Sequence, residues 1–87
     1  MANKKYGDKL AKKIKEYLEE EKSLLKIKEE ESRTPNYTRY TNIYEIKDKD
    51  LAMVYTYQSD DIGHFENVWL IGSQEKISKL EKEVGLD

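Results

Sequence analysis

The sequence contains no cysteine, one proline, one histidine and four glycines. The absence of cysteine excludes a disulfide framework, a zinc site built on thiolates and a cysteine nucleophile. The glycines stand apart from one another, so the sequence has no glycine-rich loop of the kind that holds phosphates. No serine lies in a pattern that pairs a nucleophile with a base. We therefore expect a protein that is not an enzyme and that binds no cofactor.

Long apolar runs are also missing. No stretch approaches the roughly 18 residues of a membrane-spanning helix, and the first residues are charged rather than signal-like. These features predict a cytoplasmic protein with no membrane partner. With 87 residues, the chain is expected to form a single domain, residues 1–87, with a modest core and little room for a deep cleft.

Charged residues are abundant, at 39% of the chain, and 14 lysines and 12 glutamates dominate them. Such a Lys/Glu excess is typical of thermophile proteins. The net charge of −2 argues against wholesale coating of DNA. However, residues 1–16 carry six lysines against two acids, whereas residues 17–31 carry six glutamates against three lysines. The positive charge is therefore concentrated at the beginning of the chain.

The first element is predicted to be an amphipathic helix that starts at Asn3 or Asp8 and ends near Lys22. Its apolar residues recur at steps of three and four, which places them on one stripe. Residues 23–31 fit either a continued helix or an edge strand, and the loss of phase after Glu21 favours the strand.

Three runs rich in β-branched and aromatic residues follow the proline-containing turn 32–36, and they predict strands at 37–46, 51–58 and 65–71. Their short polar links favour an antiparallel meander. Ser73 is a good N-cap for a second helix over 74–84, which Gly85 ends. The expected fold is α+β: an N-terminal helix, three or four antiparallel strands and a C-terminal helix, with both helices on one sheet face. The apolar stripes of the helices predict the helix side of the core, formed by Leu10, Ile14, Leu18, Ile77, Leu80 and Val84.

The segment 60–66, which includes most of the predicted loop 59–64, combines Asp60, Asp61, His64 and Glu66, all of which are residue types that bind divalent metals. Its spacing matches no calcium loop, and an acidic hairpin loop explains the same residues. We therefore predict no metal site there.

The basic residues of the first helix suggest contact with RNA or DNA. Lysines at positions 5, 9 and 12 would share one helix face, opposite the apolar stripe, and clustered cations can neutralise phosphates. The hypothesis is a small accessory subunit of a nucleoprotein assembly such as a ribosome or a polymerase, which binds RNA or DNA with this helix. The predicted nucleic-acid-binding residues are Lys4, Lys5, Lys9, Lys12, Lys13, Arg33 and Arg39.

Aromatic residues are concentrated in the predicted strands, and strand alternation cannot place all of them beneath two helices. Tyrosine and tryptophan are enriched in protein interfaces. The alternative hypothesis is a protein-only interaction module, either a homodimer or an inhibitor that docks on an enzyme. The predicted partner-binding residues are Tyr37, Tyr40, Tyr44, Tyr55, Tyr57 and Trp69.

Overall fold

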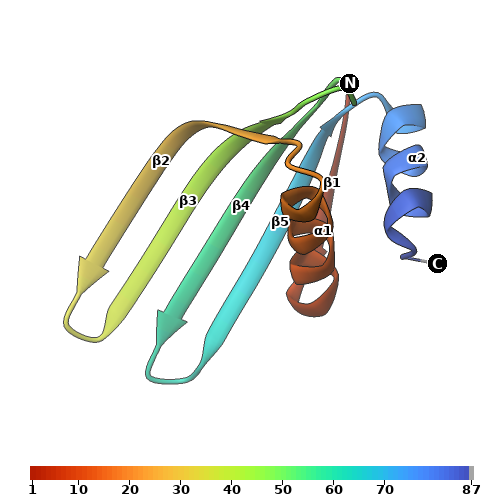
Figure 1. Ribbon diagram of the computed structural model, residues 1–87. Coiled ribbons are helices and arrows are strands. Elements are labelled where there is room, and N and C mark those ends of the chain that lie inside the picture. The colour runs from red at the N-terminus through yellow and green to blue at the C-terminus, as the bar shows by residue number, and fades with distance from the viewer. Residues whose placement is uncertain (87) are drawn as a thin grey trace.

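The computed structural model describes residues 1–86, which form two α-helices and one five-stranded antiparallel sheet (Figure 1). The strand order across the sheet is β1-β5-β4-β3-β2. The predicted α+β class and antiparallel sheet are confirmed, but the sheet has five strands rather than three or four. In chain order the elements are β1 (Ala2–Gly7), α1 (Asp8–Glu20), β2 (Leu24–Thr34), β3 (Tyr37–Ile46), β4 (Leu51–Asp60), β5 (His64–Gly72) and α2 (Gln74–Val84).

The strand that the sequence did not predict is β1. It pairs with β5 from Ala2 opposite Gly72 to Gly7 opposite Asn67. Placing the first residues in the helix was therefore wrong, whereas the alternative start at Asp8 is confirmed. Gly7 is the N-cap, with an extended backbone.

α1 ends at Glu20, two residues before the predicted end. The backbone N–H of Ser23 donates to the carbonyl of Leu18 at 3.0 Å, and that of Lys22 donates to the carbonyl of Glu19 at 3.0 Å. This pair of bonds is a Schellman motif, with Lys22 in the left-handed conformation at φ 57°. The motif stops the helix and releases the next residues to form β2, the edge strand that the sequence favoured.

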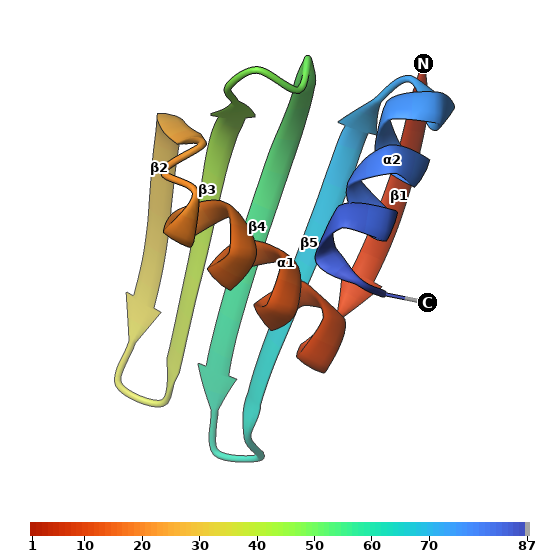
Figure 2. The ribbon, with the colours of Figure 1, turned by 45° about the vertical axis from the view of Figure 1, so that its right-hand side comes forward.

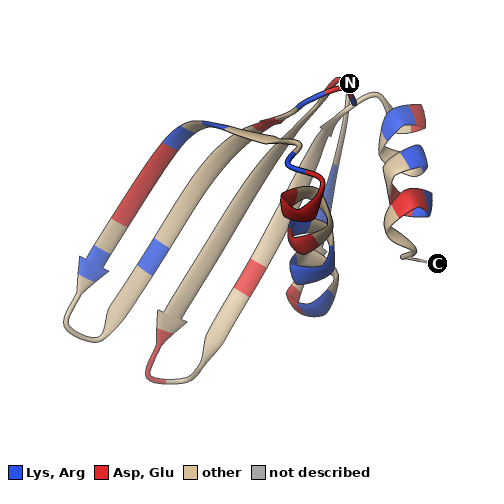
Figure 3. Ribbon diagram, in the orientation of Figure 1, with Lys and Arg blue, Asp and Glu red and all other residues tan. Residues whose placement is uncertain are grey.

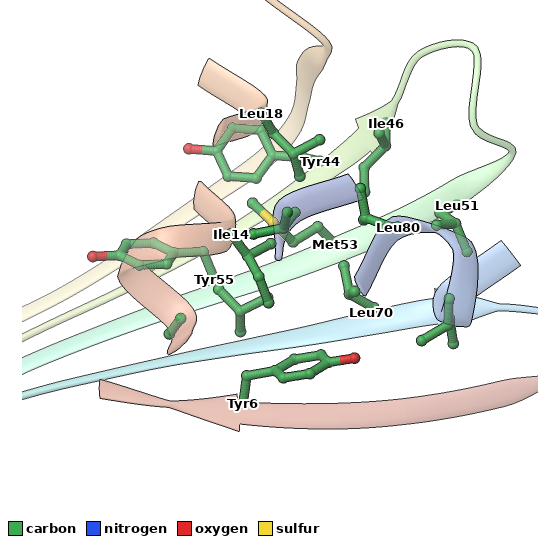
Figure 4. Packing of buried hydrophobic residues seen from close by; sticks show 14 residues of the cluster. Tyr6, Ile14, Leu18, Tyr44, Ile46, Leu51, Met53, Tyr55, Leu70 and Leu80 are labelled. Carbon is green, nitrogen blue, oxygen red and sulfur yellow. The ribbon is translucent and has the colours of Figure 1, made fainter. Parts of the chain in front are cut away.

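The buried side chains of the strands point to one side of the sheet, here called the inner face. The pairing register shows this alignment, because Val68 lies between Tyr6 and Tyr55 on neighbouring strands. In Figure 2, α1 runs diagonally across the sheet and α2 lies in front of β1 and β5. Figure 4 shows the packing of the resulting core. Its members are Tyr6, Ala11, Ile14, Leu18, Tyr44, Ile46, Leu51, Met53, Tyr55, Val68, Leu70, Ile77, Leu80 and Val84.

Five of the six predicted core residues on the helices are buried, and the exception is Leu10. Leu10 is 43% exposed to solvent, whereas Ala11 is fully buried. Because α1 begins only at Asp8, Leu10 lies in the first turn. The inward stripe of the helix therefore runs through Ala11, Ile14 and Leu18.

Glu81 of α2 ties β1 to the second helix. Its carboxylate accepts hydrogen bonds from the ammonium group of Lys4 at 2.6 Å and from the hydroxyl of Tyr6 at 2.8 Å. The bond from Lys4 is the main reason that the pKa of Glu81 is lowered. Burial, together with the neighbouring carboxylate, raises the pKa of Tyr6.

Because the pKa of Glu81 is lower in the folded chain than in the unfolded one, its ionised form stabilises the fold above its ordinary pKa of 4.5. That contribution is lost as the pH falls through the folded pKa. We expect Glu81→Gln to cost about 1 kcal/mol or less at pH 7. Urea denaturation measured between about pH 6 and pH 3 should show that the free energy of unfolding falls less with decreasing pH in this variant than in the parent chain. Equal losses in the two proteins would contradict the assignment.

Candidate interaction surfaces

The predicted basic helix face does not exist as a unit, because Lys4 and Lys5 belong to β1. Successive strand residues point to opposite faces, so these two lysines diverge. Lys4 binds Glu81 at 2.6 Å on the inner side. Lys5 lies on the other side, with its ammonium group 5.4 Å from the ring centroid of Trp69. The prediction that Lys5 shares a helix face with Lys9 and Lys12 is therefore wrong.

The remaining lysines of the hypothesis lie in the first half of α1, as the blue segment in Figure 3 shows. Lys13 donates to the carbonyl of Gly85 at 2.8 Å, so it caps the end of α2. Lys12 lies 4.0 Å from Glu16. Lys9 and Lys12 also line an open hollow together with two carboxylates and the histidine, namely Asp8, Glu66 and His64. The local charge around this half of the helix is thus mixed.

Arg33 and Arg39 lie on neighbouring strands but on opposite faces, because Arg33 pairs with Thr38 and Arg39 with Ser32. Arg33 lies 2.9 Å from the carboxylate of Glu31. It also donates to the hydroxyl of Tyr40 at 3.1 Å, and this hydrogen bond is the main cause of its raised pKa. The structure therefore distributes the seven predicted basic residues over several surfaces.

The six predicted aromatic residues are also divided. Tyr44 and Tyr55 lie in the core. Tyr40 and Tyr57 face the same side but are only partly buried, at the end of the sheet near the β2–β3 turn. Tyr37 and Trp69 point to the opposite side of the sheet, here called the outer face.

The two partly buried tyrosines form a polar cluster with His64 on the inner face. The ring centroids of Tyr40 and Tyr57 are 5.9 Å apart, and those of Tyr57 and His64 are 6.0 Å apart. The hydroxyl of Tyr57 lies 2.9 Å from Nδ1 of His64. These contacts join β3, β4 and β5 at this end of the sheet.

The outer face carries an apolar row that crosses the middle of the sheet. Trp69, Val54 and Ile43 lie directly opposite one another on β5, β4 and β3. Ile71 and Ala52 are paired in the adjacent row. All five side chains are half-buried, and none belongs to the core cluster.

Sequence reasoning identified Trp69 but missed its neighbours on the outer face. The alternation along β4 was the available signal, because Ala52 and Val54 interleave with the core residues Met53 and Tyr55. Their alignment with Ile43 depends on the register, which the composition of each strand does not specify.

Charges on the outer face are balanced. The strands place the cations Lys5, Lys28 and Arg39 there, together with the carboxylates Glu30, Glu45 and Asp60. A surface that neutralises phosphates needs more cations than carboxylates, and the outer face has no such excess.

In the loop 61–63, the carboxylate of Asp60 accepts hydrogen bonds from the backbone N–H groups of Ile62 at 2.8 Å and Gly63 at 3.1 Å. These bonds lower the pKa of Asp60, and they show that it holds the turn together. Within residues 1–86, the side chains of His, Asp and Glu form no group of three or more that could hold a metal ion. The prediction of no metal site at His64 remains a prediction.

Comparisons with models of protein families, with curated proteins and with solved structures give no match for this chain. Neither of the two helices within residues 1–86 is long and apolar enough to cross a membrane.

Proposed function

We propose that this chain is a non-enzymatic interaction module that binds a partner protein through the outer face of its sheet. The observation that carries the proposal is the unbroken apolar row of Trp69, Val54 and Ile43, which lies outside the core. Interface centres are enriched in aromatic residues and depleted in charge. The proposal takes both helices to lie on the inner face, which leaves the outer face free for the partner.

The rim of this surface supports the same conclusion. Lys5 lies beside Trp69 and Lys28 beside Ile43, at the two ends of the apolar row, and the carboxylates Glu30 and Glu45 lie on the same face. A polar border of this kind is typical of protein interfaces. The matching partner presents an apolar patch with a polar border. Trp69 is the expected centre of binding energy, because tryptophan is over-represented among the residues that dominate interfaces.

Contact with nucleic acid is the second candidate, and one contact favours it. Lys5 lies over the ring of Trp69, and an exposed aromatic ring with a nearby cation can stack a base and neutralise its phosphate. The nucleic-acid-binding surface would then be the outer face rather than the first helix. Lys5 and Arg39 are the cations available there. The mixed charge of the face makes it the weaker of the two functions.

Val54→Glu tests the protein-binding function, because it places a carboxylate at the centre of the apolar row. The side chain is half-exposed, so we expect the fold to persist. Partner capture should fall at least about tenfold, the effect of losing about 1.4 kcal/mol of binding free energy. Thr34→Glu is the matched control, since it adds the same charge to the outer face at the far end of β2.

The measurement is capture from native lysate, with and without nuclease and at two salt concentrations, with each captured protein quantified. The proposal would be supported by a captured protein whose binding persists after nuclease treatment and at high salt. The Thr34→Glu variant should still capture this protein, and the Val54→Glu variant should not. Capture that is equal for Val54→Glu and the parent chain would refute it. Capture that disappears with nuclease, or that weakens steeply with salt, would favour the nucleic-acid function.

A further inference from the structure

The free edge of β2 is a second surface, distinct from the outer face. β2 is the last strand of the sheet and pairs only with β3. It has 11 residues, and every one after Leu24 is exposed. An edge strand of this length presents a row of backbone N–H and C=O groups to which another strand can pair. The opposite edge, β1, has only six residues.

The charges along β2 have an internal symmetry. Lys26 and Lys28 precede Glu29, whereas Glu30 and Glu31 follow it. The strand therefore has a positive half and a negative half around one central residue. If two copies of this strand ran antiparallel, the positive half of each would face the negative half of the other.

The bulge in β2 makes this pairing consistent with the direction of the side chains. The register against β3 shifts between Lys26 and Lys28, so Ile27 is the extra residue. Lys26 lies opposite the core residue Tyr44 and Glu31 lies opposite Tyr40, which places both on the inner face. Lys28 and Glu30 lie opposite Ile43 and Thr41, on the outer face. Without the bulge, Lys26 and Glu31 would point to opposite faces, because they are an odd number of positions apart.

We propose that β2 pairs antiparallel with β2 of a second copy of this chain, with Glu29 on the two-fold axis. A two-fold axis perpendicular to the sheet keeps the inner faces of both copies on one side. In this register Lys28 faces the partner's Glu30, and Lys26 faces the partner's Glu31. Symmetry repeats both pairs, and opposite charges directly across an antiparallel pair stabilise it.

Other registers lose this match. Centring the axis on Glu30 places Glu29 opposite the partner's Glu31 and Lys26 opposite the partner's Arg33, which are pairs of like charge. Centring it on Lys28 removes half of the favourable pairs. Charged edge strands usually resist pairing with other edges, and on β2 the same charges select one partner in one register.

In the single chain, these groups form ion pairs within β2. Lys28 lies 3.0 Å from Glu30, Lys26 lies 3.3 Å from Glu29, and Arg33 lies 2.9 Å from Glu31. Because all these side chains are exposed, they can exchange these pairs for contacts across the axis. The proposed dimer has one like-charge contact, between the two copies of Glu29.

Charge exchange tests the pairing with two variants of the full chain. The acidic variant is Lys26→Glu with Lys28→Glu, and the basic variant is Glu30→Lys with Glu31→Lys. Each alone converts every favourable cross-strand pair into a like-charge pair, so each should dimerise at least about tenfold more weakly than the parent chain. Mixed together, they should form a heterodimer, because the substituted positions of one variant then face opposite charges in the other.

Sedimentation equilibrium over a range of concentrations measures these associations. Lys79→Glu with Lys82→Glu is the matched control for the acidic variant, since it makes the same change in net charge on α2 and should leave dimerisation unchanged. Glu29→Gln removes the like-charge contact at the axis and should strengthen the dimer. Circular dichroism confirms that each variant is folded.

Three results would overturn the proposal: a parent chain that is monomeric up to about 1 mM, charge variants that fail to associate on mixing, or equal weakening by the α2 control. Open-ended polymers would instead indicate pairing of β2 with β1. Failure of this test would leave the outer-face function standing, because Val54→Glu changes a different surface.

Discussion

Replacing Tyr6 with alanine should lower the free energy of unfolding by about 3–5 kcal/mol, as expected for removal of a buried aromatic ring. Tyr6 is 4% exposed and is the only buried residue of β1. Its ring supplies the apolar contact that holds this strand against the core. A loss of this size is a large part of the stability of a small domain, so the variant should be partly unfolded at moderate temperature.

Tyr6→Phe is the control that separates the ring from the hydroxyl. It keeps the aromatic surface and removes only the hydrogen bond to Glu81, which still receives one from Lys4. We expect this change to cost about 1–2 kcal/mol. Urea denaturation of both variants measures the difference. An alanine variant no less stable than the phenylalanine variant would show that β1 does not depend on this ring.

Ile14→Ala should cost about 2–5 kcal/mol, because it removes buried methyl groups and leaves a cavity beneath α1. Ile14 has no exposed surface. Leu10→Ala provides an internal comparison on the same helix. Since Leu10 is 43% exposed, its truncation should change stability by about half a kcal/mol or less.

Thermal and urea unfolding of the two variants test which side of α1 faces the sheet. We expect the large loss of stability from Ile14→Ala and the small one from Leu10→Ala. The reverse order would mean that α1 is rotated about its axis relative to the structure described above.

Sequence patterns predicted β3, β4, β5 and α2 because their signals are local. The two helix-end signals, Ser73 and Gly85, are confirmed: the Ser73 side chain accepts the N–H of Lys76, and Gly85 adopts a left-handed conformation with φ 83°. The strands combine β-branched and aromatic residues with turns at both ends, and these preferences need no knowledge of distant contacts.

β1 was not predictable in the same way. Its residues are Ala-Asn-Lys-Lys-Tyr-Gly, with weak strand preference and one buried side chain. It is a strand because β5 provides its hydrogen-bonding partners and Glu81 fixes Lys4 and Tyr6. Tertiary context here outweighs local preference. The misplacement of Lys4 and Lys5 on a helix, and hence the predicted basic face, followed directly from this missing strand.

The candidate binding surface was predictable only in part, for a related reason. Aromatic content suggested an interface, but the sequence could not separate the tyrosines of the core from Trp69 on the outer face. That separation depends on which strands are neighbours and in which register they pair. The charge symmetry of β2 was likewise invisible, because the bulge at Ile27 decides which of its charges share a face.

The pairing of β1 with β5 has a consequence for the order in which the chain folds during its synthesis. Ala2 is synthesised long before its partner Gly72. The hairpins of β2 to β5 join neighbours in sequence, so they can form as the chain emerges. Until β5 and α2 are released, β1 has no partner and the edge of the nascent sheet is open. Completion of the sheet and closure of Glu81 onto Lys4 and Tyr6 therefore come late in folding, after β5 and α2 have been released.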